Sequence, residues 1–315
     1  MADVAPLVSV VIPAHNYGRY VQRAVQSVLS QSHPRVELIV LDDGSTDNTR
    51  EVLGRLPGAF HWESHANMGQ AQTLNKGWQM ARGEILAYLS ADDALAPGAV
   101  TAAVSALSAS TDAVATYCDF ELIDPASRAI RHVRTPAFDY SRLVAELECE
   151  PGPGAFFRRA AWQRSGGWNP ALRQMPDYDF WLRLGLQGRF VRIPLVLAQY
   201  RVHGASQTFA RASEAEADEP IRIISEFFAR RDLPDDIRAL QPRAVAKANL
   251  VSAQLHFRAG RWRTAFERVR AARAIDSASV GSMDSLRLAA NALFNRAGHR
   301  FLWTLRNLFS GRSSL

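Results

Sequence analysis

Short runs of β-branched and aliphatic residues alternate with amphipathic stretches through the first half of the chain. Residues 8–12, 37–41 and 85–89 each have the length and composition of a buried strand. Between them, residues 20–31 and 69–80 repeat apolar side chains with helical spacing. This alternation is typical of βαβ units, which build a mostly parallel sheet flanked by helices. The sequence therefore predicts an α/β fold for this part of the chain.

Further strand patterns extend the α/β region to about residue 204. Residues 60–63, 114–120 and 190–200 are each predicted to form a strand. After residue 204 only helical patterns follow. We therefore predict two domains, an α/β domain at residues 1–208 and an all-α C-terminal domain at residues 209–315.

The C-terminal region contains one distinctive helical pair. Residues 253–260 and 262–272 are similar to a single tetratricopeptide unit, with Gly260 at the turn. One such unit cannot bury its own apolar face, so we expect a helical cap and not a repeat array.

The composition is typical of a folded, soluble protein. Hydrophobic residues make up 47% of the chain and charged residues 22%, which excludes a wholly disordered chain. The two cysteines, Cys118 and Cys149, lack the spacing of a disulfide framework or of a metal site. No signal-peptide pattern opens the chain, and no run approaches the ~20 apolar residues of a membrane span. We therefore expect a cytoplasmic protein.

Positive charge is concentrated near the C-terminus. Residues 251–315 contain eleven arginines and three acidic residues. The basic motifs with interleaved aromatics that indicate nucleic-acid binding are missing, so we expect no nucleic-acid partner. Residues 301–309 show a basic amphipathic pattern. Such a helix could lie at the inner face of the membrane as a peripheral contact, or pack on its own domain, and the sequence leaves both interpretations open.

Two pairs of adjacent aspartates follow two of the predicted strands. Asp42 and Asp43 close the second strand, and Asp92 and Asp93 follow the fourth. A single Asp-Asp pair is most often a turn or a helix cap. Two pairs in one βα array are more specific, because open α/β sheets bind ligands at the carboxyl ends of their strands. They suit a nucleoside diphosphate held through Mg²⁺ or Mn²⁺.

Several ordered motifs carry a closer resemblance. They are, in chain order, Val8-Ser-Val-Val-Ile-Pro-Ala-His-Asn16, Asp42-Asp-Gly-Ser-Thr-Asp47, Asn67-Met-Gly69, Leu89-Ser-Ala-Asp-Asp93 and Asp177-Tyr-Asp-Phe-Trp-Leu-Arg183. Over roughly residues 7–205 the chain resembles the family 2 glycosyltransferases, which share the Rossmann-like GT-A fold. The resemblance implies an inverting enzyme that moves a sugar from a UDP-, dTDP- or GDP-linked donor to a carbohydrate or lipid-linked acceptor, with Mg²⁺ or Mn²⁺ as cofactor. It further implies a role in cell-surface polysaccharide or glycoconjugate assembly.

The resemblance also assigns roles on the donor side of the site. Residues implied to contact the donor nucleotide are Pro13, His15, Asn16, Asp43 and Asp92. Among these, Asp43 matches the carboxylate that hydrogen-bonds the base, and Asp92 faces the ribose. Asp93 matches the metal ligand of the family.

On the acceptor side, Asp177 matches the catalytic base of the family, although its pattern alone is also that of a helix N-cap. Asp179 lies two positions further on, and one of the two aspartates is expected to serve the acceptor while the other supports the structure. Arg201 is a candidate for diphosphate contact, and His203 for diphosphate or metal contact. Trp168 offers either a flat face for a sugar ring or a core side chain.

Three positions depart from the common family pattern. Ser90 stands where many members have the first aspartate of the metal motif, Leu74 where many have arginine, and Pro176 where a glutamate usually precedes the base. These departures keep a second interpretation open, namely a catalytically inactive scaffold or sensor that binds nucleotide sugars. A nucleotidyltransferase is disfavoured, because no glycine-rich phosphate loop follows the first strand.

Overall fold

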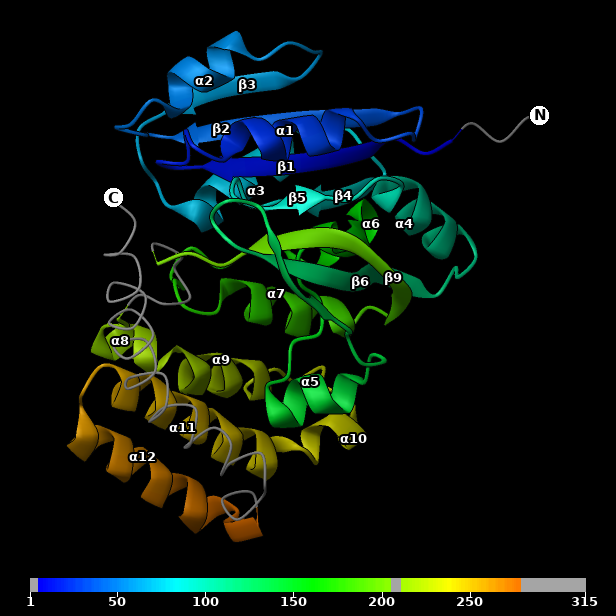
Figure 1. Ribbon diagram of the computed structural model, residues 1–315. Helices are drawn as coiled ribbons and strands as arrows, with labels where there is room; N and C mark the ends of the chain where they lie inside the picture. The colour runs from blue at the N-terminus through cyan, green and yellow to red at the C-terminus, as the bar shows by residue number, and fades with distance from the viewer. Residues whose placement is uncertain (1–4, 205–210, 279–315) are drawn as a thin grey trace, which may run out of the picture. The chain divides into compact units, whose positions relative to one another are not determined.

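The computed structural model describes residues 5–204 and 211–278 of the chain, which forms two compact units (Figure 1). The first unit consists of Met1–Leu143 and Cys149–Ser206, and the second of Val144–Glu148 and Gln207–Leu315.

A mixed sheet forms the centre of the first unit. Its strands within the described residues are β1 (Val8–Ala14), β2 (Val36–Asp43), β3 (His61–His65), β4 (Ile85–Tyr88), β5 (Ala94–Leu95), β6 (Ala113–Ile123), β7 (Ala129–Val133), β8 (Phe156–Arg158) and β9 (Arg189–Arg201). Their order is β3-β2-β1-β4-β8-β6-β9-β5, with β7 paired to β6. β1, β2, β3 and β4 run parallel, as do β6 and β9, whereas β8 is antiparallel to both β4 and β6. The predicted α/β class with a mostly parallel sheet is confirmed.

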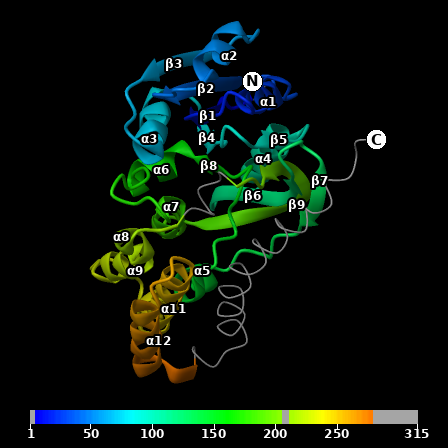
Figure 2. The ribbon, with the colours of Figure 1, turned by 60° about the vertical axis from the view of Figure 1, so that its left-hand side comes forward.

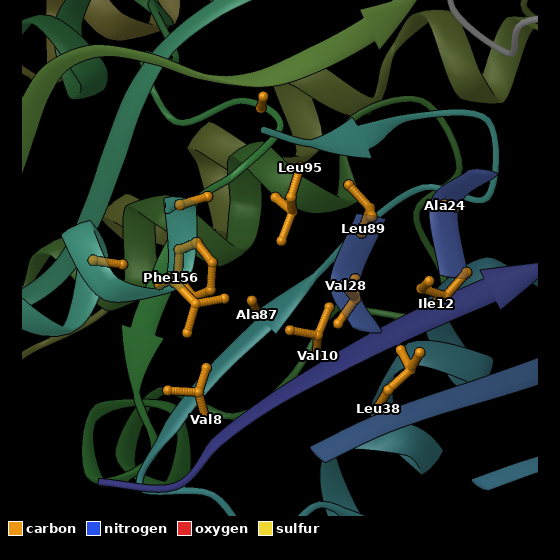
Figure 3. Close-up of a cluster of buried hydrophobic side chains, with 14 of the residues drawn as sticks. Val8, Val10, Ile12, Ala24, Val28, Leu38, Ala87, Leu89, Leu95 and Phe156 are labelled. Carbon is orange, nitrogen blue, oxygen red and sulfur yellow. The ribbon is translucent and has the colours of Figure 1, made fainter. Parts of the chain in front are cut away.

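Helices pack on the sheet of this unit (Figures 1 and 2). They are α1 (Val21–Leu29), α2 (Thr49–Arg55), α3 (Gln70–Met80), α4 (Ala99–Ser108), α6 (Arg159–Ser165) and α7 (Pro176–Gly185), and α5 (Tyr140–Glu146) runs from the first unit into the second. Val10 and Ile12 of β1 join a buried cluster with Val28 of α1 (Figure 3). The intervening Val11 lies against Gly77 of α3, where an added Cβ would come within 2.4 Å of Val11 Cγ1. Alternate residues of β1 thus pack against α1 on one face of the sheet and against α3 on the other, because successive side chains of a strand point to opposite faces.

The register of β1 brings the functional motifs to one edge of the sheet. Ala14, the last residue of β1, pairs with Asp42 of β2. On the other side of β1, Val11 pairs with Tyr88, the last residue of β4. One aspartate pair therefore ends β2 and the other follows β4, on either side of β1, at the carboxyl edge where open α/β sheets bind ligands.

Some elements differ from those expected from the sequence. Proline favours the first turn of a helix, which indicates a helix start at Pro97, but α4 begins at Ala99, because Gly98 takes a φ of +79° that the right-handed helix does not allow. The strands β5, β7 and β8 were not predicted. β8 has three residues, and β7 is largely exposed, so neither shows a clear alternation of apolar and polar side chains.

The described part of the second unit is helical, as predicted. Its helices are α8 (Glu214–Ala217), α9 (Glu219–Phe228), α10 (Asp235–Arg238), α11 (Gln241–Arg258) and α12 (Trp262–Ile275). α11 and α12 form the expected helical pair, and Gly260 takes a φ of +83° in the turn between them. No helix among the described residues is long and apolar enough to cross a bilayer. The expected domain boundary near residue 208 and the amphipathic pattern at residues 301–309 lie outside the described residues.

Candidate active site at the carboxyl edge of the sheet

The first aspartate pair forms the last two residues of β2. The buried Asp42 carboxylate accepts a 2.6 Å hydrogen bond from the Ser64 hydroxyl. The buried Asp43 carboxylate accepts hydrogen bonds from the backbone amides of Met68 (2.7 Å) and Gly69 (2.9 Å), just before α3 begins. Asp43 therefore fixes the loop that enters α3. Its oxygens still have lone pairs for a further donor, as the predicted contact with the base requires.

His15 and Asn16 follow β1 and lie beside the Asp43 loop. His15 Nδ1 lies 2.8 Å from the Asp43 carbonyl oxygen. Asn16 takes a φ of +60°, which asparagine tolerates better than most residues, and its Oδ1 accepts a 2.8 Å hydrogen bond from the Thr46 amide. Pro13 is buried in β1 beyond the stretch that pairs with β4, so its missing N–H leaves that ladder intact. The structure brings the predicted base-binding residues together.

The second aspartate pair is held by the end of β9. Asp92 Oδ2 lies 2.9 Å from His203 Nε2. Asp93 Oδ1 accepts a 2.8 Å hydrogen bond from the Arg201 backbone amide, and Arg201 Nε donates to the Asp92 carbonyl oxygen at 2.8 Å. Segments more than 100 residues apart thus form one cluster. Here Asp92 is the aspartate that faces His203, whereas the resemblance led us to expect Asp93 beside the metal and Asp92 beside the ribose.

Arg201 is enclosed by protein groups. Its side chain is buried, and Nη1 donates to the Asp124 carbonyl oxygen (2.8 Å) and to Ser127 Oγ (2.9 Å). The guanidinium carbon lies 4.6 Å from the centre of the Tyr20 ring. These contacts correct the expectation that Arg201 reaches the diphosphate, because its donors hold the loop of the second aspartate pair in place.

Two tyrosines that the sequence analysis did not single out surround His203. The rings of Tyr17 and Tyr20 lie 6.2 and 5.4 Å from the imidazole ring. The Tyr17 hydroxyl is hydrogen-bonded to the Asp92 carboxylate, and burial followed by the negative charges of Asp92 and Asp93 raises the pKa of Tyr17. Because Tyr17 directly follows the Pro13–Asn16 motif, its sequence position alone could have identified it as a candidate residue of the site.

The second aspartate pair suits a divalent cation. Burial, and next the charge of Asp92, raise the pKa of the Asp93 carboxyl well above its usual range, so the positive charge of a bound cation would stabilise its ionised form. The 2.9 Å between Asp92 Oδ2 and His203 Nε2 is close to the separation of about 3 Å between adjacent octahedral ligands at about 2.1 Å from an ion. No three His, Cys, Asp or Glu side chains in the described residues form a complete cage. A cation here would need oxygens from the donor diphosphate, the usual arrangement for Mg²⁺.

Asp177 occupies the first turn of α7 and is partly buried. Its Oδ1 accepts a 2.8 Å hydrogen bond from the Tyr178 amide. Burial raises the pKa of the Asp177 carboxyl despite this bond. Asp177 also interacts electrostatically with Tyr88 at the end of β4, as does Asp93. The predicted base and one member of the second aspartate pair thus both act electrostatically on Tyr88.

Asp179 and Trp168 are both held by other side chains of the first unit. Asp179 Oδ2 forms a 2.6 Å ion pair with Arg183, which also donates to the Gly167 carbonyl oxygen at 2.7 Å. Asn75 holds the backbone of Trp168 through two hydrogen bonds of 2.7 and 2.8 Å. Because the Trp168 side chain is only 4% exposed, it offers no free face to a sugar, and of our two interpretations the core side chain is correct.

Comparison with known proteins identifies the family. The chain matches the family model of glycosyl transferase family 2 over residues 9–164. It is 31% identical over 225 residues to an uncharacterized glycosyltransferase of Nostoc sp., covering 67% of this chain and 70% of that protein. It is also 26% identical over 234 residues to the chondroitin synthase of Escherichia coli, covering 71% of this chain and 33% of the synthase.

Solved structures share the fold. The S. aureus TarS 1-349 structure in complex with UDP-GlcNAc has a TM-score of 0.63 at 16% identity, with 84% of this chain and 90% of that chain covered. The mannosyltransferase PcManGT from Pyrobaculum calidifontis, in complex with GDP-Man and Mn²⁺, has a TM-score of 0.60 at 21% identity, with 96% and 84% covered. Together, the ordered motifs, the sheet and the sequence matches show that this chain belongs to glycosyltransferase family 2 and is a nucleotide-sugar-dependent enzyme of the inverting type.

Proposed function

We propose that this chain transfers a sugar from a UDP-, dTDP- or GDP-linked donor to a hydroxyl of a carbohydrate or lipid-linked acceptor, with a divalent metal at Asp92 and His203 and with Asp177 as the base. The arrangement around Tyr88 carries this proposal. Asp92 Oδ2 and His203 Nε2 lie 2.9 Å apart, the carboxyl of the partly buried Asp177 has a raised pKa, and Asp177 and Asp93 both interact electrostatically with Tyr88.

On the donor side, His15, Asn16 and Asp43 would border the base. Asp92 and His203 would hold the metal, and Asp93 would add negative charge beside it. Mg²⁺ or Mn²⁺ bound here would stabilise the negative charge that develops on the leaving diphosphate. Arg201 is a positioning residue, because its hydrogen bonds fix the backbone of Asp92.

On the acceptor side, Asp177 would take the proton of the acceptor hydroxyl as its oxygen attacks the anomeric carbon. The new carbon–oxygen bond forms on the face opposite the departing nucleoside diphosphate, which leaves with the electron pair of the broken bond. A raised pKa suits this role, because a carboxylate is a stronger base when burial disfavours its charge.

Three comparisons support the choice of substrates. The neighbouring structures hold UDP-GlcNAc in one case and GDP-Man with Mn²⁺ in another. Relatives include the hyaluronan synthase of Pasteurella multocida, 30% identical over 203 residues, although the chain covers only 21% of that protein. We therefore propose a role in polysaccharide or glycoconjugate assembly. A cytoplasmic location, with the region at residues 301–309 at the inner face of the membrane, is part of the same proposal.

A nucleotide-sugar panel tests the proposed function. Each donor is incubated with the full chain, with and without Mn²⁺, while nucleotide release and the unfolding temperature are measured. We expect one donor class to raise the unfolding temperature and to release its nucleotide only when the metal is present. Donor binding without any release by the wild type, with or without added sugar acceptors, would instead favour the inactive sensor. Neither binding nor release would contradict both.

A further inference from the structure

Tyr88 is the last residue of β4, and its ring is held in place by aromatic neighbours. The ring of Trp168 lies 5.1 Å away at an interplanar angle of 74°, and the ring of Trp78 lies 6.3 Å away at 76°. Both tryptophans are buried. This edge-to-face packing is a favourable arrangement for aromatic side chains and fixes the orientation of Tyr88.

The hydroxyl of Tyr88 differs from those of two other tyrosines of this unit. The Tyr117 hydroxyl donates to the Pro136 carbonyl oxygen at 2.7 Å, and the Tyr178 hydroxyl donates to the Leu143 carbonyl oxygen at 2.9 Å. Within the described residues, no protein group forms a hydrogen bond with the Tyr88 hydroxyl, and the residue is partly exposed. Because a tyrosine hydroxyl at a largely buried position usually has a partner, this group is available to a ligand.

Tyr88 interacts with one residue from the acceptor side of the proposed site and one from the donor side. Its electrostatic neighbours include Asp177 and Asp93, and burial followed by these charges raises the pKa of Tyr88 well above its usual range. The hydroxyl therefore stays protonated at neutral pH and can donate a hydrogen bond. The sugar in transit must lie between the leaving diphosphate near Asp92 and the acceptor oxygen near Asp177.

We propose that the Tyr88 hydroxyl donates a hydrogen bond to a hydroxyl of the sugar being transferred, and so helps to select the donor sugar. This inference rests on the proposed function. It differs from the roles of Asp92 and His203, which would hold the diphosphate through the metal. Loss of the Tyr88 hydroxyl should therefore affect the nucleotide sugar and not the free nucleotide.

The test is Tyr88→Phe, with Tyr117→Phe as the matched control. Dissociation constants are measured for UDP, UDP-GlcNAc, GDP and GDP-mannose with Mn²⁺ present, together with unfolding temperatures. For Tyr88→Phe we expect about 3- to 10-fold weaker binding of the preferred nucleotide sugar, the range for one neutral hydrogen bond, and unchanged binding of the corresponding nucleotide. Its unfolding temperature should match that of the wild type, because no internal hydrogen bond is lost. Tyr117→Phe should show the reverse, with a lower unfolding temperature and unchanged binding.

Other outcomes overturn the inference. Equal binding of the nucleotide sugar by Tyr88→Phe and the wild type would show that the hydroxyl makes no sugar contact. Equal weakening of nucleotide and nucleotide sugar would show that Tyr88 acts through the metal loop. If the wild type binds none of these ligands, the proposed function itself fails, and the inference fails with it.

Discussion

The two aspartate pairs have the same sequence pattern but different surroundings. The Asp43 carboxylate accepts hydrogen bonds from two backbone amides of the loop that enters α3. Asp92 faces a side chain from the far end of the domain, His203, and Asp93 is buried with a raised carboxyl pKa. A carboxylate that accepts hydrogen bonds from backbone amides organises a loop. Two carboxylates that lie close together are stabilised in their ionised form by a bound cation. Asp42 and Asp43 are therefore called the loop-organising pair below, and Asp92 and Asp93, which we propose to lie at the metal, the metal-binding pair.

The largest expected effect follows from replacing the proposed base, Asp177. Asp177→Asn should lower the transfer rate about 10²- to 10⁴-fold, the usual contribution of a general base, while donor binding stays intact. The rate is measured under saturating donor and metal, and donor affinity is measured separately by calorimetry.

Asp179→Asn is the matched control, two positions along the same helix. It breaks the ion pair with Arg183, so we expect a loss of about 1–3 kcal/mol in the free energy of unfolding, with the transfer rate largely retained. If Asp179→Asn abolishes transfer and Asp177→Asn does not, the two assignments must be exchanged.

The next effect tests the metal-binding pair directly. Asp92→Asn should weaken the apparent affinity for Mn²⁺ by at least about 10-fold in the presence of nucleotide, because one of two protein ligands loses its charge. The corresponding change in the loop-organising pair, Asp42→Asn, should leave Mn²⁺ affinity unchanged. Titration of Mn²⁺ followed by calorimetry distinguishes the two variants, and similar losses in both would remove the distinction between the pairs.

The loop-organising pair should respond through stability. Asp43→Asn loses one of the two acceptors that hold the amides of Met68 and Gly69, and leaving a buried amide unpaired costs about 1–3 kcal/mol. We expect a lower unfolding temperature without ligand and weaker nucleotide binding. An unchanged unfolding temperature would show that the loop before α3 does not depend on Asp43.

The smallest effect is a pH dependence at Asp177. Because its pKa is raised in the folded state, folding favours the protonated form, and ionised Asp177 lowers stability above that pKa. Without metal, Asp177→Asn should therefore be more stable than the wild type at pH 7–8. The difference should shrink as the pH falls through the raised pKa. Unfolding curves across this pH range measure it, and a variant less stable than the wild type at pH 8 would contradict the assignment.

The parallel half of the sheet could be predicted from the sequence because burial on both faces leaves a local pattern. β1 and β2 are mostly apolar and buried along most of their length, and β2 ends in two aspartates. The antiparallel insertion of β8 could not be predicted, because a three-residue strand depends on partners that are distant in the chain. The positive φ of Gly98 makes α4 begin at Ala99. The preference of proline for the first helical turn had indicated an earlier start, at Pro97.

The residues of the site could be predicted better than their contacts. Asp43 ends β2, Asp92 follows β4 and His203 follows β9, so these three lie at the carboxyl edge of the sheet. The sequence could not show that Arg201 would turn its guanidinium toward the carbonyl oxygen of Asp92, since that contact joins segments 109 positions apart. For the same reason, it could not be predicted that the Tyr88 hydroxyl would lack an internal partner.

Anomalous diffraction from crystals of the full chain grown with Mn²⁺ and UDP or GDP tests the central distinction most directly. We predict a manganese peak within about 2.5 Å of Asp92 Oδ2 and His203 Nε2, with diphosphate oxygens completing the coordination. A nucleotide-bound peak beside Asp42 and Asp43, or a diphosphate bound with no ion between Asp92 and His203, would contradict it.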